Sequence, residues 1–258
     1  ARKLYQKYVK LPNGNIDSGI LAKWQLLEEN INSKEYLKKI HQLIFSAGLQ
    51  PQLSTIQSKE LEALMSAKKH KEAFELAKKI LGNSDSTVSA KARARFSQGL
   101  ILEDEFENQS LKSKIERIAI VIGLKTQRLE KVQSAYEAAI KFGVGEISVK
   151  AMRRLGSSYL NYARAIRAIE LPTDPDQAAD VLVLRGELEK LATPMEEKGY
   201  GVLMEALSLA RKFEGGGEYI NEIESAINQS QEKKWTPKFK VIIDQPEIMV
   251  PKVKEAST

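Results

Sequence analysis

The chain has 258 residues, enough for one large domain or two small ones. Apolar residues make up 42% of it and charged residues 29%, whereas aromatic residues reach only 7%, a mixture that favours helices and disfavours a β-sandwich or barrel. The absence of cysteine excludes disulfides, thiolate zinc sites and a cysteine nucleophile. The net charge is +6, but the chain lacks the basic runs with interleaved aromatic residues that indicate a nucleic-acid partner.

Residues 1–50 are expected to form an N-terminal helical segment. The stretch PNGN at 12–15 is typical of a turn, and helical patterns follow over 20–30 and 33–47. The stretch GLQP at 48–51 then interrupts the pattern, which predicts a boundary near this point. The chain begins with alanine rather than methionine, as expected of a processed or trimmed product.

Consecutive helices are predicted in the next part of the chain. Segments 56–69 and 70–81 both carry helix-forming residues, and Gly82 is expected to end the second one as its C-cap. The stretch NSDST at 83–87 supplies the next N-cap, and a long helix is predicted over 89–107. The residues of this long helix that are expected to face inward are Ala90, Ala94, Leu100 and Leu102.

An isoleucine-rich stretch at 113–122 has two interpretations. Its core, IAIVI, fits a buried strand, but the wider periodicity is helical and good helix formers flank it on both sides. We therefore expect a helix here. Further helices are predicted over 125–142 and, after a GVGE turn, over 147–169.

The clearest break in the helical pattern is LPTDPD at 171–176. Helical sequence resumes over 177–192. Thr193 and Pro194 are expected to start a new helix that reaches residue 213, because proline directly after a Ser or Thr cap is favoured at the first helical position. One more helix is predicted over 218–231.

The spacing within these helices resembles the tetratricopeptide repeat, a helix–turn–helix unit of about 34 residues. Its second helix has a small residue, a bulky residue four positions later and a small residue three positions after that. This spacing occurs at Val132, Tyr136 and Ala139, and more loosely at Ala73, Ala77 and Ile80. The stretch LGSSY at 155–159 matches the Leu-Gly-Tyr pattern of the first helix. The match is partial, because no uninterrupted array of such units spans the chain.

The glycine inside LGSSY has a physical reason. A glycine in the middle of a helix costs about 1 kcal/mol relative to alanine, and it is tolerated where a neighbouring backbone packs closely. We therefore expect Gly156 to lie at a close helix crossing, and Gly99 to do so one hairpin earlier. Tyr136 and Tyr159 are expected in the core, because aromatic residues at helical spacing usually pack inside.

A narrower resemblance is carried by ARARFSQGLILEDEFE at 92–107, LKTQRLEKVQSAYEAAIKFG at 124–143 and ELEKLATPMEEKG at 187–199. These segments resemble tetratricopeptide proteins of the Gram-negative cell envelope, found beside Tol-Pal-type and gliding-motility components. The resemblance implies an all-α fold, an irregular α-solenoid of helical hairpins. It also implies a periplasmic, non-enzymatic scaffold that binds other envelope proteins or peptides. The cytoplasm is the alternative compartment.

The resemblance covers roughly residues 90–213, and the breaks in the helical pattern divide the whole chain into three parts. An N-terminal helical segment takes residues 1–50, a tetratricopeptide-like repeat region takes 51–232 with its break near 171–176, and an extended or partly disordered tail takes 233–258. Apolar residues alternate with polar ones in the tail, as in a segment that docks along an edge or groove. These apolar residues are Trp235, Phe239, Val241 and Ile243.

The first helices of tetratricopeptide units line a concave groove, and the family register of LGSSY implies a set of partner-binding residues. They are Lys150, Arg153, Arg154, Asn161 and Tyr162. Lys150 and Arg154 lie one helical turn apart, which suits them to bind one carboxylate together. The alternative is that these charges only solvate the helix and that Tyr162 belongs to the core.

No motif in the chain predicts catalysis, a cofactor or a metal. Nucleotide loops of the GxxxxGK[ST] or GxGxxG type are absent, as are GxSxG and HExxH. His41 and His70 have no second ligand at a metal-like spacing. The acidic cluster at 103–105 is expected to be a solvated helix face, because adjacent helical side chains point about 100° apart.

These observations favour a non-enzymatic scaffold without a cofactor. No apolar run approaches the roughly 20 residues that span a bilayer, so no membrane-spanning segment is expected. The alternative function is a sensor or regulatory helical domain that binds a small ligand or a cell-wall fragment. A buried polar pocket of several hundred Å³ favours that alternative, whereas an open groove wider than a helix favours the scaffold.

Overall fold

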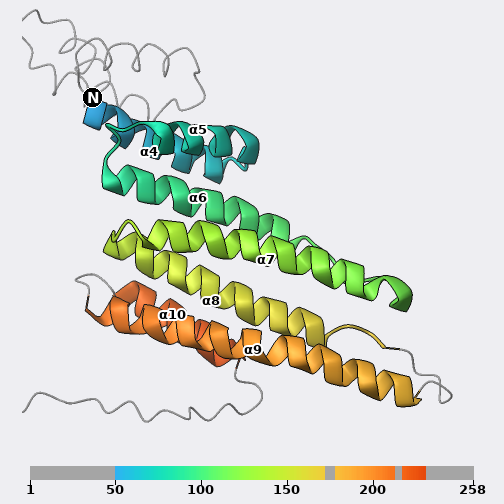
Figure 1. Cartoon of the computed structure of the whole chain (residues 1–258). Coiled ribbons are helices and arrows are strands. Elements are labelled where there is room, and N and C mark those ends of the chain that lie inside the picture. Colours follow the sequence, from blue (N-terminus) through green and yellow to red (C-terminus); the bar gives the residue numbers. More distant parts are fainter. Residues whose placement is uncertain (1–49, 172–177, 213–216, 231–258) are drawn as a thin grey trace, which may run out of the picture.

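The computed structural model describes residues 50–171, 178–212 and 217–230 (Figure 1). No strand occurs in these ranges, so the predicted all-helical class is confirmed for them. The helices are α4 (Gln50–Ser66), α5 (His70–Gly82), α6 (Val88–Glu107), the short 3₁₀ helix η1 (Ile115–Arg117), α7 (Ile118–Ile140), α8 (Gly145–Arg167), α9 (Ala178–Arg211) and α10 (Gly217–Ser230). Predictions for the N-terminal segment, the 171–176 break beyond Leu171 and the C-terminal tail lie outside the described residues.

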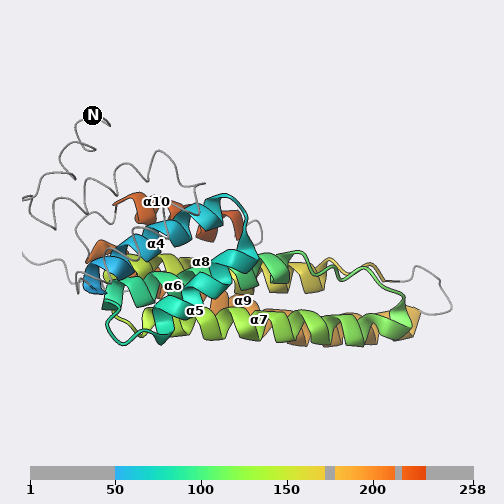
Figure 2. The same cartoon turned by 90° about the horizontal axis from the view of Figure 1, so that it is seen from above.

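The helices form a stack in which each one runs back along its predecessor (Figure 1). Each helix from α4 to α9 contacts the next one, and further contacts join α4 to α6, α6 to α8 and α8 to α10. Within the described residues, no comparable contact joins α5 to α7 or α7 to α9. The even-numbered helices therefore form one connected layer. In the view down the stack, α4 and α10 lie at one edge, and α7 and α9 lie at the opposite edge (Figure 2).

Residues at the helix ends explain several boundaries. α4 is described from Gln50 onward, so it includes residues 50–55, which precede the predicted start at residue 56. Gly82 is the last residue of α5 rather than its cap, which is the next residue. Thr87 caps α6 as predicted, since its hydroxyl accepts a hydrogen bond of 3.2 Å from the Ala90 backbone N–H.

The isoleucine-rich stretch is helical, as predicted, but it belongs to a longer helix than expected. η1 covers only three residues, and α7 then continues from Ile118 to Ile140 without a break. The helices predicted separately at 113–122 and 125–142 are therefore largely one. Gly143 follows α7 with a φ of +68°, in the left-handed region that favours glycine, and turns the chain toward α8.

The predicted helix start at Thr193 and Pro194 is wrong, because α9 continues through both residues. An internal proline costs about 3 kcal/mol relative to alanine, but both halves of α9 pack on α8. Leu188 is buried before the proline and Leu203 after it. The Thr193 hydroxyl accepts a hydrogen bond of 3.4 Å from Arg167 of α8 instead of capping a new helix. Packing against α8 therefore overrides the local break signal.

The core follows the stack. α6, α7, α8 and α9 share one buried cluster, which contains Tyr136 and Tyr159 as predicted. Smaller clusters join α4, α5 and α6, and join α8, α9 and α10. On α6, the alanines predicted to face inward are buried, whereas Leu100 and Leu102 are only partly covered.

Close packing occurs at the glycines that the sequence pattern singled out. A Cβ atom added at Gly156 of α8 would lie 2.7 Å from Cγ of Leu203 and 3.0 Å from the carbonyl oxygen of Gly199, both on α9. A Cβ atom added at Gly99 of α6 would overlap the ring of Tyr136 on α7. The close helix crossing is confirmed at Gly156. At Gly99 a tyrosine ring, rather than a backbone, fills the space.

A buried lysine ties the end of α6 to α7. Lys125 Nζ donates hydrogen bonds of 2.9 Å to the carbonyl oxygens of Phe106 and Gln109, and it lies 4.4 Å from the centroid of the Phe106 ring. Burial lowers the pKa of this lysine. Carbonyl groups at a helix C-terminus lack intrahelical donors and carry partial negative charge, so the ammonium group satisfies them and fixes the end of α6.

We expect Gly156→Ala to lower the free energy of unfolding by about 1–3 kcal/mol, the usual cost of overpacking, because the added methyl group meets the α9 backbone. Gly123 of α7 is the matched control, since nothing lies within 4 Å of a Cβ atom added there. Gly123→Ala should raise the free energy of unfolding by about 0.5–1 kcal/mol. Urea unfolding followed by circular dichroism measures both, and equal stability of the variants would contradict the close crossing.

We expect Lys125→Met to lower the free energy of unfolding by about 2 kcal/mol, because the α6 carbonyl groups lose a charged donor while remaining covered. Lys131→Met is the control, since Lys131 is exposed on the same helix; its effect should stay within about 0.5 kcal/mol. Hydrogen exchange should also become faster in the last turn of α6 in the Lys125 variant alone. Unchanged exchange there would show that the lysine does not hold this helix end.

Candidate functional site

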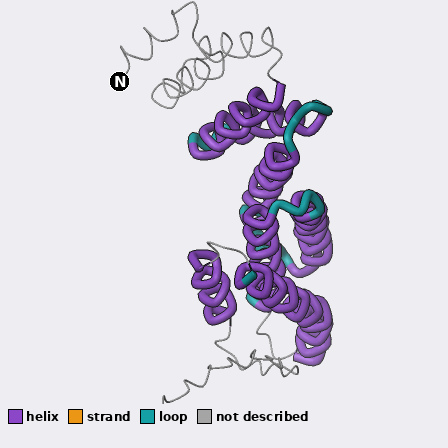
Figure 3. Tube along the Cα trace, turned by 90° about the vertical axis from the view of Figure 1, so that its left-hand side faces the viewer, coloured by secondary structure: helices purple, strands orange, loops and turns teal. Residues whose placement is uncertain are grey.

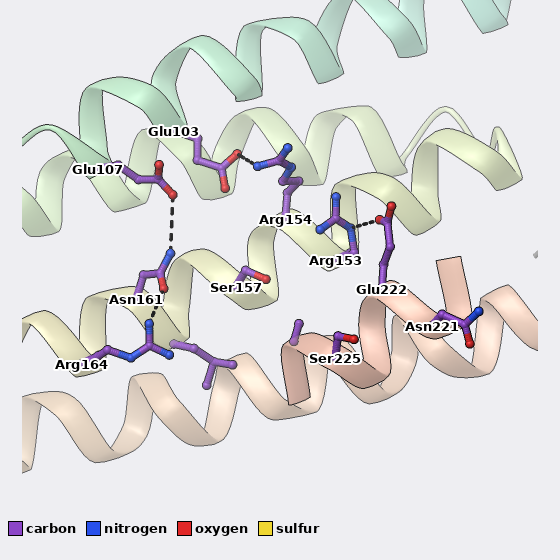
Figure 4. A pocket seen from close by; sticks show the side chains of 12 residues that line it. Glu103, Glu107, Arg153, Arg154, Ser157, Asn161, Arg164, Asn221, Glu222 and Ser225 are labelled. Carbon is purple, nitrogen blue, oxygen red and sulfur yellow. Dashed lines mark hydrogen bonds and ion pairs between the residues drawn. The ribbon is translucent and has the colours of Figure 1, made fainter. Parts of the chain in front are cut away.

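A polar hollow lies where α6, α8 and α10 meet (Figure 4). Its volume is about 500 Å³. α8 contacts both other helices, whereas α6 and α10 share no comparable contact within the described residues, so the hollow follows α8 with α6 on one side and α10 on the other. Figure 3, in which the stack runs from top to bottom and the view is roughly along the helices, shows α10 standing to one side of the other helices. We call this hollow the groove.

α8 places a continuous stripe of side chains in the groove. The stripe follows the helical spacing of three or four residues and consists of Arg153, Ser157, Leu160 and Arg164, with Arg154 and Asn161 beside it. Because the stripe runs along the helix, an elongated ligand that lies on α8 meets an arginine at either end.

The sides of the groove are mainly acidic and amide groups. α6 contributes Glu103 and Glu107, one helical turn apart. α10 contributes Asn221, Glu222 and Ser225, which also lie on one face of their helix, together with the small apolar Ala226. The groove therefore presents arginines flanked by carboxylates and hydrogen-bonding groups, with little apolar surface.

The arginines have acidic or amide neighbours that leave donors open. Nε of Arg153 lies 3.1 Å from Oε2 of Glu222, yet this buried N–H makes no hydrogen bond because the angle is poor. Nη1 of Arg154 lies 3.7 Å from Oε2 of Glu103, which is an ion pair without a hydrogen bond. Arg164 donates a hydrogen bond of 3.1 Å to the side-chain oxygen of Asn161, one helical turn earlier. Figure 4 draws these three contacts as dashed lines.

Glu103 is a buried carboxyl group, with 4% of its surface exposed. It accepts a hydrogen bond of 2.6 Å from the Tyr136 hydroxyl on Oε2 and one of 3.1 Å from the Ser158 hydroxyl on Oε1. Burial raises the pKa of Glu103, although the hydrogen bond from Tyr136 and the charge of Arg154 oppose this. Burial and the charge of Glu103 raise the pKa of Tyr136 well above its usual value, so the phenol stays protonated and can donate.

The expectation that the acidic cluster at 103–105 is a solvated face is wrong for Glu103. Asp104 and Glu105 are exposed as expected, but Glu103 lies on the buried side of α6. The sequence contained the signal, because Glu103 falls at helical spacing with Ala92, Gly99 and Phe106 on the same face. A glutamate in an otherwise small and apolar stripe indicates a buried carboxyl group with dedicated hydrogen-bond donors.

The structure brings three of the predicted partner-binding residues together. Arg153, Arg154 and Asn161 all line the groove. Tyr162 does not, because it is 2% exposed and its hydroxyl is 2.7 Å from the Thr126 hydroxyl of α7. Its proposed place on an open surface is therefore corrected to the core.

Lys150 also lies away from the groove. Its Nζ donates a hydrogen bond of 2.6 Å to Oε1 of Glu146 and lies 5.4 Å from the centroid of the Tyr219 ring on α10. Arg93 of α6 approaches the same carboxylate at 3.5 Å. The hydrogen bond from Lys150 lowers the pKa of Glu146. Lys150 thus takes part in a contact between helices, and the structure does not pair it with Arg154 around one site.

Sequence reasoning missed Arg164, Glu107 and every groove residue of α10. Arg164 continues the α8 stripe by helical spacing and could have been found from it. The α10 residues carried no signal, because their place depends on how that helix packs against α8. In the described ranges, no group of three or more His, Asp or Glu residues is placed to hold a metal ion. The same ranges contain no helix with the length and apolar character needed to cross a bilayer.

Glu103→Gln should change how stability depends on pH. The folded protein holds the Glu103 proton more tightly than the unfolded chain, so this residue contributes stability at low pH that is lost as the pH rises through the folded pKa. The glutamine cannot ionise. We expect the free energy of unfolding of the variant, relative to the parent, to increase between about pH 4.3, the ordinary glutamate value, and neutral pH. Urea unfolding at a series of pH values measures this.

Glu107→Gln is the matched control, because Glu107 lies one turn along the same helix and is exposed. It should show no comparable trend with pH. A Glu103→Gln difference that stays constant across the pH series would mean that the buried carboxyl group does not titrate differently in the folded and unfolded states.

Comparisons of the chain with protein-family models, with curated proteins and with solved structures each gave no match.

Proposed function

We propose that this protein is a non-enzymatic scaffold that binds an acidic segment of a partner protein in the groove. We also propose that the helices that carry the groove form an irregular α-solenoid of tetratricopeptide-like hairpins. Such a protein acts through the area and the charges of its binding surface and not through reactive groups. The observation that carries the proposal is the row of arginines along α8 in an open, polar groove.

The helix packing supports a tetratricopeptide-like solenoid. The sequence resemblance makes α7 a second helix and α8 a first helix, and first helices line the inner surface in that family. The even-numbered helices contact one another, and three of them border the groove. The hairpins are longer than in the family, since α6 and α7 alone have 20 and 23 residues, whereas a whole repeat has about 34.

The arginines favour an anionic partner. Guanidinium groups bind carboxylates through paired N–H donors. The Arg154 side chain is 41% exposed and the Arg153 side chain 23% exposed, so a ligand in the groove can reach the Arg154 guanidinium group most readily. Acidic side chains of a partner are therefore a better match for this stripe than basic ones.

The proposed location is the periplasm, with other envelope proteins or peptides as partners. The resemblance to envelope proteins found beside Tol-Pal-type and gliding-motility components supports this location. The absence of cysteine is compatible with an oxidising compartment, where a stray thiol is a liability. The cytoplasm is the alternative.

A second candidate function is a sensor or regulatory domain that binds a small ligand or a cell-wall fragment. The volume of about 500 Å³ and the polar lining favour it, because small-molecule sites have this size. Such sites enclose most of their ligand, however, whereas Arg164, Asn221 and Ser225 are exposed. Binding of a muropeptide, together with no binding of an acidic peptide, would favour this second function.

The test is the affinity for a fluorescein-labelled oligo-glutamate peptide, measured by fluorescence anisotropy. Replacing Arg153 and Arg154 together by glutamine should weaken binding about tenfold or more, because each charge-assisted hydrogen bond contributes about 1.5–3 kcal/mol. Affinity for the unaltered protein should also fall as salt is added, since part of the attraction lies at an exposed surface. An oligo-glutamine peptide should not bind.

The matched control replaces Arg117 and Arg185 by glutamine, which removes the same charge from exposed positions outside the groove. This control should bind the peptide with nearly unchanged affinity. Equal loss in both double variants would mean that net charge, rather than the groove, attracts the peptide. No loss in either would reject the groove as the binding site.

A further inference from the structure

Glu103 lies beside Arg154 on the α6 side of the groove (Figure 4). Its residue surface is 4% exposed, whereas the Arg154 side chain is 41% exposed, and 3.7 Å separates the two charged groups. Of the two charged groups, Arg154 is therefore the one that a ligand in the groove reaches more readily. An anion bound by Arg154 has to share that guanidinium group with Glu103.

The charge on Glu103 is supported from two neighbouring helices. Tyr136 of α7 and Ser158 of α8 donate hydrogen bonds to its two carboxyl oxygens, at 2.6 Å and 3.1 Å. Arg154 of α8 adds a positive charge beside Oε2. Of Tyr136, Ser158 and Arg154, only Arg154 also lines the groove. A ligand can therefore compete with Glu103 only for the positive charge of Arg154.

Other groups oppose that charge or are already paired. Burial disfavours the ionised form, and the Glu107 carboxylate, one turn along α6, repels it. On the α10 side of the groove, Glu222 faces Arg153 at 3.1 Å, so these two charges largely offset one another. Arg154 is therefore the positively charged neighbour that favours the ionised form of Glu103, in addition to the hydrogen bond from Tyr136.

We infer that the groove takes up a proton together with an anionic ligand: the anion pairs with Arg154, and a proton from solvent bonds to a carboxyl oxygen of Glu103. This inference rests on the proposed function, because it describes how the same groove binds an acidic segment. The groove then binds acidic segments more tightly as the pH falls.

Electrostatics determines the direction of the coupling. A ligand carboxylate at Arg154 brings a second negative charge close to Glu103 and engages the guanidinium group that had stabilised the first. Both effects favour the neutral form of Glu103. Protonation in turn leaves Arg154 with one anionic partner instead of two, which strengthens its contact with the ligand. By linkage, the proton and the anion must favour each other equally.

The coupling acts in a limited pH window. The window begins near the pKa of Glu103 in the free protein and ends near its higher pKa in the complex. Within it, the dissociation constant should rise by up to about tenfold per pH unit, the limit for one proton. Outside it, affinity should not depend on this residue's titration.

Isothermal titration calorimetry of the full chain with the oligo-glutamate peptide tests the inference. Measurements at one pH in two buffers with different ionisation enthalpies give the number of protons taken up. The peptide carboxylates are ionised at about pH 6.5, well above the ordinary glutamate pKa of about 4.3. We expect a net proton uptake for the unaltered protein, almost none for Glu103→Gln, and the same uptake as in the unaltered protein for the control Glu105→Gln, which changes an exposed residue of α6 outside the groove.

Each outcome has a distinct meaning. Binding without proton uptake, or with uptake that persists in Glu103→Gln, would overturn the inference and leave the proposed function standing. If the peptide does not bind at any pH, the proposed function fails and the inference fails with it. Proton uptake that is lost only in Glu103→Gln supports both.

A second measurement needs no ligand and keeps the coupling testable if Glu103→Gln folds poorly. Arg154→Gln withdraws the same positive charge that a bound anion would engage. Titration of the ¹³C-labelled glutamate carboxyl groups by NMR should show a higher pKa for Glu103 in this variant than in the unaltered protein, and no comparable change in Arg164→Gln. An unchanged Glu103 titration in Arg154→Gln would remove the physical basis of the inference.

Discussion

The hydrogen bonds that hold the Glu103 carboxyl group are the interaction on which the groove depends. Through them α6 is joined to Tyr136 of α7 and to Ser158 of α8, at the point where these helices pack together. A buried carboxyl group is costly unless donors surround it, and a hydrogen bond to a charged acceptor contributes about 1.5–3 kcal/mol. Ser158 is next to Ser157 of the stripe, so its hydrogen bond to Glu103 joins α8 to α6 where the stripe from Arg153 to Arg164 lines the groove.

Most helices could be predicted from the sequence because each carries its own local information. The Thr87 cap starts α6, and Gly143 turns the chain after α7. What could not be predicted is where a helix continues against a local signal. α9 passes through Pro194 because residues before and after it are buried against α8, and that contact is absent from any short stretch of sequence. The stacking order likewise depends on contacts between helices and not on the pattern within one.

The site could be predicted only where a single helix determines it. The register of LGSSY oriented α8 well enough to bring Arg153, Arg154 and Asn161 to the groove. Tyr162 was placed wrongly because it is one residue further along, about 100° around the helix, and this rotation moves it from the groove to the core. The α10 residues could not be found, since that helix reaches the groove only through its packing on α8.

The buried carboxyl group is itself a consequence of a missing side chain. Gly99 lies one helical turn before Glu103, and the ring of Tyr136 occupies the space where a Cβ atom at Gly99 would be. Because the ring can approach the α6 backbone there, its hydroxyl reaches the Glu103 carboxyl group at 2.6 Å. A larger residue at position 99 would push the ring away and leave the carboxyl group without its shortest hydrogen bond. A glycine in the middle of a helix lowers stability by about 1 kcal/mol. In return, Gly99 leaves the space that lets Tyr136 hydrogen-bond the buried Glu103 carboxyl group beside the arginines of α8.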